Sequence, residues 1–580
     1  MAARRILREA RRYALVVAPA VAVALQTLHL VMPATAQARP AYVRAPGGPF
    51  MVDGQGRRLE LHGANLVAKC GSDTHPSTVA GSPCLPGGHG HPNYVLTPDA
   101  RDPGWRFTAR DATALHRLGF TLVRLGVIWA GLEPGPKAAH ENDSTYCAQH
   151  LPGTPFPNLG NRDPYSQTKL EAYLDKVDRI VGLLARAHIR VVIDMHQDGW
   201  GRPFANPDGS PPWMSEGAPA WATCTMGFPF QKPDHWQGAY TDPAVNAALD
   251  HLWENDVAVD LQGQFIRVWK GIASHYAHNR SVIGYELFNE PSGPEAVSPA
   301  QFDRQLQCFY AGSSYAPASC ASSGSQAPPA GLIPAIQSAD SHHLVFYEAP
   351  VLTDFGSPET IGIAEPLHFP RLAISFHDYG GVPGQSTFEC SQPNCSTQED
   401  TTMSNFTSER PATQTSQPGG PAWLLSEFGA EKYVPDISHV AALADSNLLS
   451  WTYWSALQLH DPTGGPYEGL LNPRTHRPDR ARARVLARVY PLATAGTPTS
   501  QSFDPGTQAF DFTYTVDPSV HAPTLISIPL AYHYRHGYKV KVTGARVTSR
   551  RNAAILKLRN KPGAQTVTVR VRPRPRRHPH

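Results

Sequence analysis

Charge is scarce in this sequence. Only 17% of its 580 residues are Asp, Glu, Lys or Arg, and the formal net charge is +3. Since 41% of the residues are hydrophobic, the composition is not that of a disordered chain. The near balance of charge provides no broad basic surface, so we expect no nucleic-acid partner. The chain also lacks any fixed-period repeat, and its 56 prolines and 47 glycines do not follow the period of collagen.

Long apolar runs are missing as well. The main one, from Ala14 to Leu25, is shorter than the roughly 20 residues that a membrane-spanning helix needs. Several arginines precede this run, and the small-residue motif Ala36-Gln37-Ala38 follows it. This order predicts a signal peptide over residues 1–38, cleavage after Ala38 and a secreted protein. An N-terminal membrane anchor is the alternative.

No Cys-x-x-Cys motif occurs, which argues against a structural zinc site. All eight cysteines follow the predicted signal peptide, and an even number is typical of disulfides in an exported protein. Many pairings are possible, so the connectivity stays open. Short loops favour three pairs and leave a fourth between distant residues: Cys70–Cys84, Cys308–Cys320, Cys390–Cys395 and Cys147–Cys224.

Short apolar runs alternate with amphipathic segments through most of the chain. Helical periodicity is present over 108–118, 168–188 and 246–277. Between such segments we predict eight strands: 59–67, 120–129, 189–195, 282–288, 343–349, 372–377, 422–428 and 449–454. Eight β-α alternations favour an α/β fold, a parallel (β/α)8 TIM barrel over 45–490. A doubly wound open sheet is the alternative.

The pattern changes after residue 490. Five short runs of mostly alternating polarity follow without helices between them: 510–516, 525–528, 538–542, 555–558 and 565–571. Such closely spaced strands predict a small antiparallel β-sandwich over 492–572. A proline-interrupted basic tail, residues 573–580, ends the chain.

Two carboxylic acids stand directly at predicted strand ends. Glu290 follows the strand 282–288, and Glu427 lies at the end of the strand 422–428. The carboxyl ends of barrel strands share one rim, so the two side chains can face each other across the barrel mouth. A facing pair of carboxylic acids is what a retaining glycosidase needs, one as proton donor and one as nucleophile. The alternative is that each acid only neutralises a neighbouring Arg or Lys.

The segments around these acids resemble a known family. The sequences VIGYELFNEP (282–291), LLSEFGA (424–430) and SFHDY (375–379), with Arg124 and Trp454, are similar to glycoside hydrolase family 5 of clan A. The segments DMHQDGW (194–200), EGAPAWA (216–222) and 274–291 more narrowly resemble the endoglycosylceramidases and related glycolipid β-glycosidases of that family. The likeness covers about residues 45–490, and a trailing β-domain also fits it.

The resemblance implies a role for each matching residue. Glu290 would be the general acid/base and Glu427 the nucleophile, while Asn289 would bind the sugar 2-hydroxyl and Trp454 would stack on the sugar. The expected substrate-binding set is Lys69, Arg124, His196, Asp198, Asn289, His377, Tyr379 and Trp454. Opposite protonation states are required, so we predict a raised pKa for Glu290 and an ionised Glu427 beside Arg124 and Tyr379. No metal or cofactor is implied.

The expected function is therefore that of a secreted, monomeric retaining β-glycosidase that cleaves glycosphingolipids at a micelle or membrane surface. A polysaccharide endoglycanase and a non-catalytic carbohydrate-binding protein are the alternatives. A ceramide would need an apolar slot beside the catalytic mouth. Aromatic residues of the loop after residue 199 could form this slot or merely pack the loop on the barrel: Trp200, Trp213, Trp221, Trp236, Phe228 and Phe230.

Overall fold

The computed structural model describes most of the chain after residue 40. The described residues are 41–68, 95–96, 98, 106–135, 144–151, 154–201, 204, 217–231, 236–293, 298–312, 331–358, 367, 369–380, 393–409, 420–431, 433–457 and 468–575. The predicted signal peptide, Lys69 and the end of the basic tail lie outside them. No helix in the described part is long and apolar enough to cross a membrane.

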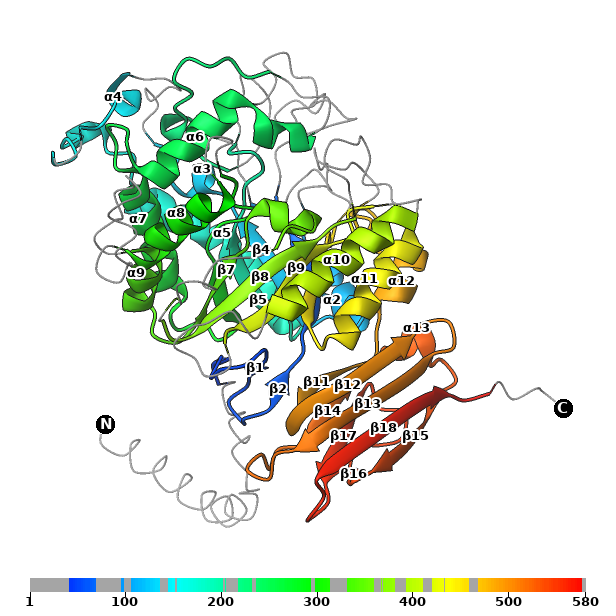
Figure 1. Ribbon diagram of the computed structural model, residues 1–580. Helices are drawn as coiled ribbons and strands as arrows, with labels where there is room; N and C mark the ends of the chain where they lie inside the picture. Colours follow the sequence, from blue (N-terminus) through cyan, green and yellow to red (C-terminus); the bar gives the residue numbers. More distant parts are fainter. Residues whose placement is uncertain are drawn as a thin grey trace, which may run out of the picture. The chain divides into compact units, whose positions relative to one another are not determined.

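Eight parallel strands close into a barrel (Figure 1). Their order around the barrel is β10-β3-β4-β5-β6-β7-β8-β9, and the predicted α/β barrel is confirmed. All residues of these strands but one are buried, which explains why they form continuous apolar runs in the sequence. Their bounds are β3 His62–Leu66, β4 Leu122–Val127, β5 Arg190–Met195, β6 Val282–Glu286, β7 Leu344–Glu348, β8 Leu372–Asp378, β9 Ala422–Phe428 and β10 Ser450–Tyr453.

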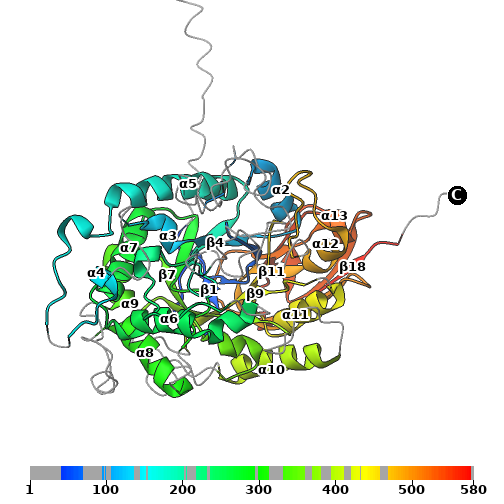
Figure 2. The same ribbon diagram turned by 90° about the horizontal axis from the view of Figure 1, so that it is seen from above.

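Helices surround the barrel, as the view from above shows (Figure 2). The apolar stripe predicted within 168–188 is the buried face of α5. The main helices are α2 Ala109–Arg117, α5 Gln167–Arg186, α6 Pro243–Glu254, α7 Leu261–Tyr276, α8 Pro299–Ala311, α9 Leu332–Ala339, α10 Pro393–Glu409, α11 Val434–Ser446 and α12 Arg480–Leu486. Shorter pieces are α3 Trp129–Leu132, α4 Ser144–Cys147, α13 Leu530–His533 and the 3-10 helices Gly160–Arg162, Ala220–Ala222, Trp236–Thr241 and Val351–Phe355.

The single helix predicted over 246–277 is wrong. Asn255 adopts a left-handed conformation with φ of 54° and ends α6. Asp260 then starts α7 by accepting a hydrogen bond from the backbone N–H of Gly263 at 2.8 Å. A left-handed asparagine and a new N-cap stop one helix and begin another, although the apolar periodicity continues on both sides.

The C-terminal strands form two antiparallel sheets (Figure 1). One has the order β12-β13-β18-β15 and the other β1-β2-β11-β14-β17-β16. The sequence did not predict that the short strands β1 and β2 would join this second sheet through β2, which pairs with β11. The bounds are β1 Met51–Val52, β2 Arg58–Leu59, β11 Tyr490–Thr494, β12 Gly496–Asp504, β13 Ala509–Val516, β14 Thr524–Ser527, β15 Tyr538–Thr543, β16 Ala545–Val547, β17 Ile555–Asn560 and β18 Thr566–Pro573.

A buried ion pair also links the barrel to these sheets. The Arg488 guanidinium donates to Asp445 of α11 at 2.7 Å and to the carbonyl of Phe503 in β12 at 2.8 Å. Both charged side chains are almost completely inaccessible to solvent. Because a buried charge is costly without its partner, this contact favours one fixed arrangement of the two parts.

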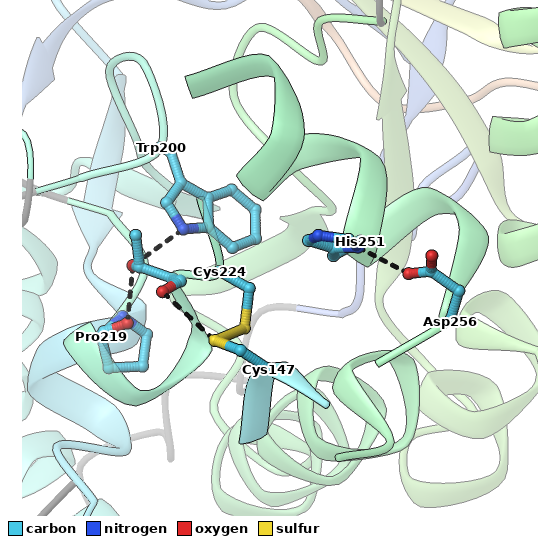
Figure 3. Close-up of a disulfide and its surroundings, with 7 residues drawn as sticks. Cys147, Trp200, Pro219, Cys224, His251 and Asp256 are labelled. Atoms are coloured by element: carbon cyan, nitrogen blue, oxygen red, sulfur yellow. Dashed lines mark hydrogen bonds and ion pairs between the residues drawn. A yellow bond between two sulfur atoms is a disulfide. The ribbon is translucent and has the colours of Figure 1, made fainter. Parts of the chain in front are cut away.

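The predicted disulfide between Cys147 and Cys224 is confirmed (Figure 3). Beside it, the Trp200 indole N–H donates to the Thr223 hydroxyl at 3.0 Å, and Thr223 in turn donates to the carbonyl of Pro219 at 3.1 Å. Cys308 is disulfide-bonded too. The remaining predicted pairs are not tested, because Cys70, Cys84, Cys320 and Cys390 lie outside the described residues and the side chain of Cys395 is not described.

Candidate active site

The polar residues predicted from strand ends lie at the same end of the barrel strands. Arg124 projects from β4, and Glu427 from the end of β9. Asn289 and Glu290 follow β6, whereas His377 and Tyr379 lie at the end of β8. The contacts given below show that these side chains converge on one buried cluster.

Glu427 is held by the two residues predicted to contact it. Arg124 donates through Nη1 to Oε1 of Glu427, and the Tyr379 hydroxyl donates to Oε2 at 2.7 Å. Burial raises the pKa of Glu427 above its usual value, although His377, Arg124 and His196 act in the opposite direction. The carboxylate is therefore ionised only at a pH above this raised pKa, a condition that the sequence did not indicate.

Glu290 is fixed through both its side chain and its backbone. Its Oε2 accepts a hydrogen bond from the Tyr240 hydroxyl at 2.9 Å, and its Oε1 lies 3.1 Å from Nδ1 of His377. The backbone is left-handed, with φ of 47°, a conformation that costs a non-glycine residue about 1–2 kcal/mol. Hydrogen bonds from its N–H to Glu348 and from Gln197 to its carbonyl hold this conformation.

His377 lies between the two glutamates. Its Nδ1 is 3.1 Å from Oε1 of Glu290 and 3.8 Å from Oε2 of Glu427. Those two oxygens are thus no more than about 7 Å apart, a limit that admits the roughly 5–5.5 Å separation of a retaining pair. Burial lowers the pKa of His377 to about 3, so the imidazole is neutral at neutral pH. His377 therefore lies nearer to Glu290 than to Glu427.

Arg124 is the cation at the centre of the site. It is fully buried and contacts four carboxylates: Asp194, Glu286, Glu348 and Glu427. Burial alone would lower the pKa of Arg124, but these carboxylates raise it well above its usual value. Its charge is therefore permanent and helps to keep Glu427 ionised.

Three other predicted residues follow β5 and β10, which are neighbours of β6 and β9 in the barrel. Nδ1 of His196 lies 2.9 Å from Asp194, and its ring stacks on Trp454 with centroids 5.4 Å apart. The Trp454 indole N–H donates to Glu468 at 2.8 Å. Asp198 is buried, with Oδ2 3.8 Å from Nε2 of His196.

Asn289 is oriented by the protein on both sides of its amide. Its Oδ1 accepts from Nη2 of Arg124 at 2.7 Å, and its Nδ2 donates to the carbonyl of Gln197 at 2.9 Å. The second amide proton remains for another acceptor. Lys69 lies outside the described residues, so its predicted contact is not tested.

Sequence reasoning missed several residues of the site. Glu286 and Glu348 end β6 and β7, so the strand-end argument that selected Glu290 and Glu427 could have found them. Tyr240 lies in a 3-10 turn, and Asp354, whose Oδ1 accepts from the N–H of His377 at 3.3 Å, lies in another. No strand pattern marks such turns.

Two of the loop aromatics do not form an apolar slot. Trp200 and Trp221 are fully buried and pack edge-on against Trp129. Trp213 and the side chain of Trp236 lie outside the described part of the chain. In contrast, Met226 and Phe228 are 55% and 52% exposed.

Glu290, Asp354 and His377 offer ligand atoms within 4.8 Å of one another, close enough to hold a metal ion. The hydrogen bond between His377 and Glu290 already accounts for part of this proximity. Hydrolysis by a glutamate pair needs proton transfer and nucleophilic attack, and neither step requires a metal.

Comparison with known proteins identifies the family. Residues 107–458, more than half of the chain, match the family described as cellulase (glycosyl hydrolase family 5). The chain belongs to glycoside hydrolase family 5. Residues 488–571 match the C-terminal domain of the same family. The protein is therefore a glycoside hydrolase with the family's barrel and C-terminal β-domain.

Individual relatives resemble nearly the whole chain. Endoglycoceramidase I of Rhodococcus hoagii (strain 103S) is 28% identical over 545 residues, which cover 92% of this chain and 86% of the relative. An endoglycoceramidase of Hydra vulgaris is 24% identical over 533 residues, covering 86% and 82% of the two chains. The solved structure of endo-glycoceramidase II from Rhodococcus sp. with ganglioside GM3 is 24% identical, with a TM-score of 0.65, and covers 91% of this chain and 100% of that one. Because the sequence identity is only 24%, this structural similarity supports the fold assignment alone.

Proposed function

We propose that this protein is a secreted retaining β-glycosidase that cleaves the linkage between glycan and ceramide in glycosphingolipids. The observation that carries the proposal is the pair of buried glutamates, Glu290 and Glu427, at facing strand ends with His377 between them. The relatives named endoglycoceramidase support the choice of substrate.

The reaction follows from the contacts of the two acids. Glu427 attacks the anomeric carbon and forms a covalent glycosyl-enzyme, while Glu290 gives its proton to the leaving oxygen of ceramide. Glu290 then takes a proton from the water that releases the glycan. A neutral His377 touches both carboxyl groups, and Arg124 and Tyr379 stabilise Glu427 when it regains its charge.

The leaving group departs on the side of Glu290, where Tyr240 contacts the acid. Asp242, two residues after Tyr240, accepts from the backbone N–H of Gln231 at 2.9 Å and so ties this turn to the segment that carries Met226 and Phe228. Exposed apolar side chains beside an active site suit a lipid substrate. We assign Met226 and Phe228 to the rim that meets the ceramide.

Secretion is supported by the disulfides. The Cys147–Cys224 bond and the disulfide-bonded Cys308 are typical of an oxidising compartment outside the cytosol. The N-terminal order of arginines, apolar run and Ala36-Gln37-Ala38 agrees with export.

The test is a product analysis with the purified chain in mild detergent. Ganglioside, glucosylceramide and a soluble β-glucan are supplied in parallel, and the products are identified by mass. We expect an intact oligosaccharide together with ceramide, and none from the Glu427→Gln variant. Products from the β-glucan alone would overturn the glycolipid assignment and favour a polysaccharide endoglycanase.

The ceramide rim has its own test. Phe228→Ser should raise KM for a micellar glycolipid several-fold and leave KM for a soluble aryl β-lactoside unchanged, because only the lipid needs the apolar rim. Val547→Ser is the matched control, since Val547 is an exposed apolar residue of β16. Equal effects of Phe228→Ser on both substrates would contradict the assignment.

A further inference from the structure

Positive charge is concentrated in the C-terminal strands of this chain. Residues 496–573, from β12 to the end of β18, contain 11 Lys and Arg, three Asp and no Glu. The formal net charge of the whole chain is only +3, so the rest of the chain is negative overall. The near balance of charge over 580 residues therefore conceals a basic domain.

Four of these cations lie together on one sheet. β15 is the edge strand of the sheet β12-β13-β18-β15 and pairs with β18 (Figure 1). In this pairing Lys539 lies directly opposite Arg572, and Lys541 lies directly opposite Arg570. Side chains that are directly opposite in an antiparallel pair share one face of the sheet. The four residues therefore form one patch, the basic face.

The basic face points away from the core. Val569 and Val571, which alternate with the arginines along β18, are completely buried in the core of the C-terminal domain. Successive side chains of a strand point to opposite faces, so the arginines point outward. Lys539 and Lys541 are exposed, and the side chain of Arg570 is 60% exposed.

One carboxylate balances this face in part. Asp511 of β13 lies 3.3 Å from Arg570 and 2.7 Å from Arg572, so a single acid serves two arginines. Among the described residues, neither Lys539 nor Lys541 has an ion-pair partner. Four cations and one carboxylate leave three positive charges on the basic face.

The other two acids of residues 496–573 contact other groups. Asp504 accepts from the Thr507 hydroxyl at 2.6 Å within its own turn. Asp517 lies 3.9 Å from Arg58 of β2. Neither contact neutralises a cation of the basic face.

The sheet itself does not require this arrangement. Like charges directly opposite each other are destabilising, and the basic face contains two such pairs. Lysines protect an edge strand from pairing with another chain, which would account for those of β15. Arg570 and Arg572, however, lie on β18, which is paired on both sides. A positive face that extends beyond the edge strand, at a cost in stability, points to an anionic partner.

We propose that the basic face docks this protein on a membrane surface that carries anionic phospholipids. The choice of a lipid partner rests on the proposed function, since a glycosphingolipid is presented in a membrane. Each Lys or Arg close to an anionic membrane strengthens binding by roughly five-fold, so three net charges contribute on the order of 100-fold. Docking in this way raises the concentration of membrane-bound substrate around the enzyme.

Vesicle binding by the purified full chain tests the proposal. Vesicles of phosphatidylcholine alone are compared with vesicles in which about one third of the lipid is phosphatidylglycerol, both without glycolipid, at low and at high salt. We expect binding to the anionic vesicles to be at least about 10-fold tighter at low salt, and this preference to disappear at high salt.

A variant of the basic face locates the contact. Lys539→Gln/Lys541→Gln/Arg570→Gln should lose most of the preference for anionic vesicles. Arg572 is left in place because it donates to the backbone carbonyl of Phe510 at 2.7 Å. An unchanged Tm shows that the variant is folded.

The matched control removes the same charge from another part of the surface. Arg110→Gln/Arg117→Gln/Lys270→Gln changes three exposed cations of α2 and α7. We expect this variant to keep the preference for anionic vesicles. Because both variants lower the net charge equally, the comparison separates a local contact from the effect of overall charge.

Several results would overturn the proposal. Equal binding to the two kinds of vesicle, or an equal loss in the two triple variants, would remove the docking surface. Tighter binding to a DNA duplex than to anionic vesicles would favour a nucleic acid. A lipid-free dimer that only the basic-face variant loses would favour a second copy of this chain.

The docking test is independent of catalysis, because the vesicles contain no glycoside. Vesicle binding without cleavage of ganglioside in detergent would refute the proposed function and leave the docking surface in place. Cleavage of ganglioside without a preference for anionic vesicles would refute only the docking surface.

Discussion

Removal of the Tyr379 hydroxyl should change how activity depends on pH. This hydroxyl donates to Oε2 of Glu427 at 2.7 Å, inside a site where both residues are buried. The surroundings raise the pKa of Tyr379 well above its usual value, so it remains a donor at every working pH. A hydrogen bond to a buried charged group contributes about 1.5–3 kcal/mol, which corresponds to about 1–2 pKa units.

The direction of the pH shift follows from the protonation state that Glu427 must adopt. As the proposed nucleophile, Glu427 has to be ionised. Tyr379→Phe removes a donor that stabilises the ionised form, so the pKa of Glu427 rises further. The acidic limb of kcat/KM therefore moves to higher pH by about 1–2 units. At a pH below the acidic limbs of both the wild type and the variant, kcat/KM of Tyr379→Phe is lower than that of the wild type by roughly 10–100-fold.

An aryl β-lactoside with a good leaving group is the appropriate substrate, because its departure needs little help from the acid. Tyr240→Phe is the matched control: it also removes one hydroxyl, but that hydroxyl donates to Glu290 at 2.9 Å. We expect Tyr240→Phe to leave the acidic limb in place and, with a glycolipid, to move the alkaline limb upward. An unchanged acidic limb in Tyr379→Phe, or an equal shift in Tyr240→Phe, would refute the reasoning.

Two further predictions concern stability. The Cys147–Cys224 disulfide closes a loop with a sequence separation of 77. Replacing both cysteines by Ser should therefore lower the free energy of unfolding by about 4–5 kcal/mol, if the disulfide acts by reducing the entropy of the unfolded chain. A urea titration that shows no loss of stability would contradict this. Arg488→Met leaves Asp445 buried without its cation and should cost roughly 3–5 kcal/mol. Arg267→Met, which breaks the exposed pair with Asp163, should cost less than about 1 kcal/mol in the same assay, and similar losses in both variants would refute the role of burial.

The barrel could be predicted from the sequence because its strands are buried on both faces. Such strands form continuous apolar runs, and the eight predicted runs coincide with β3 to β10. Helix boundaries were harder to predict, because the break at Asn255 depends on one backbone conformation and one cap rather than on periodicity. The two-residue strands β1 and β2 are too short to show a pattern, and only the pairing of β1 with β2 and of β2 with β11 reveals them.

Within the site, the sequence could point to candidate residues where a carboxyl group coincides with a strand end. Glu290 and Glu427 could be found in this way, whereas Tyr240 could not, since it reaches Glu290 from a 3-10 turn in a long loop. Aromatic residues in that loop were ambiguous from sequence alone. Trp200 and Trp221 are buried core residues, but Phe228 is exposed, and only the three-dimensional packing distinguishes them.

The most direct test of the two-glutamate mechanism is to trap the glycosyl-enzyme. The chain is incubated with a 2-deoxy-2-fluoro β-lactoside that carries an activated leaving group, digested with protease and analysed by mass spectrometry. Our mechanism predicts one added lactosyl group on Glu427, and no label on the Glu427→Gln variant. A label on Glu290, or turnover with inversion at the anomeric carbon, would contradict the assignment of the two glutamates.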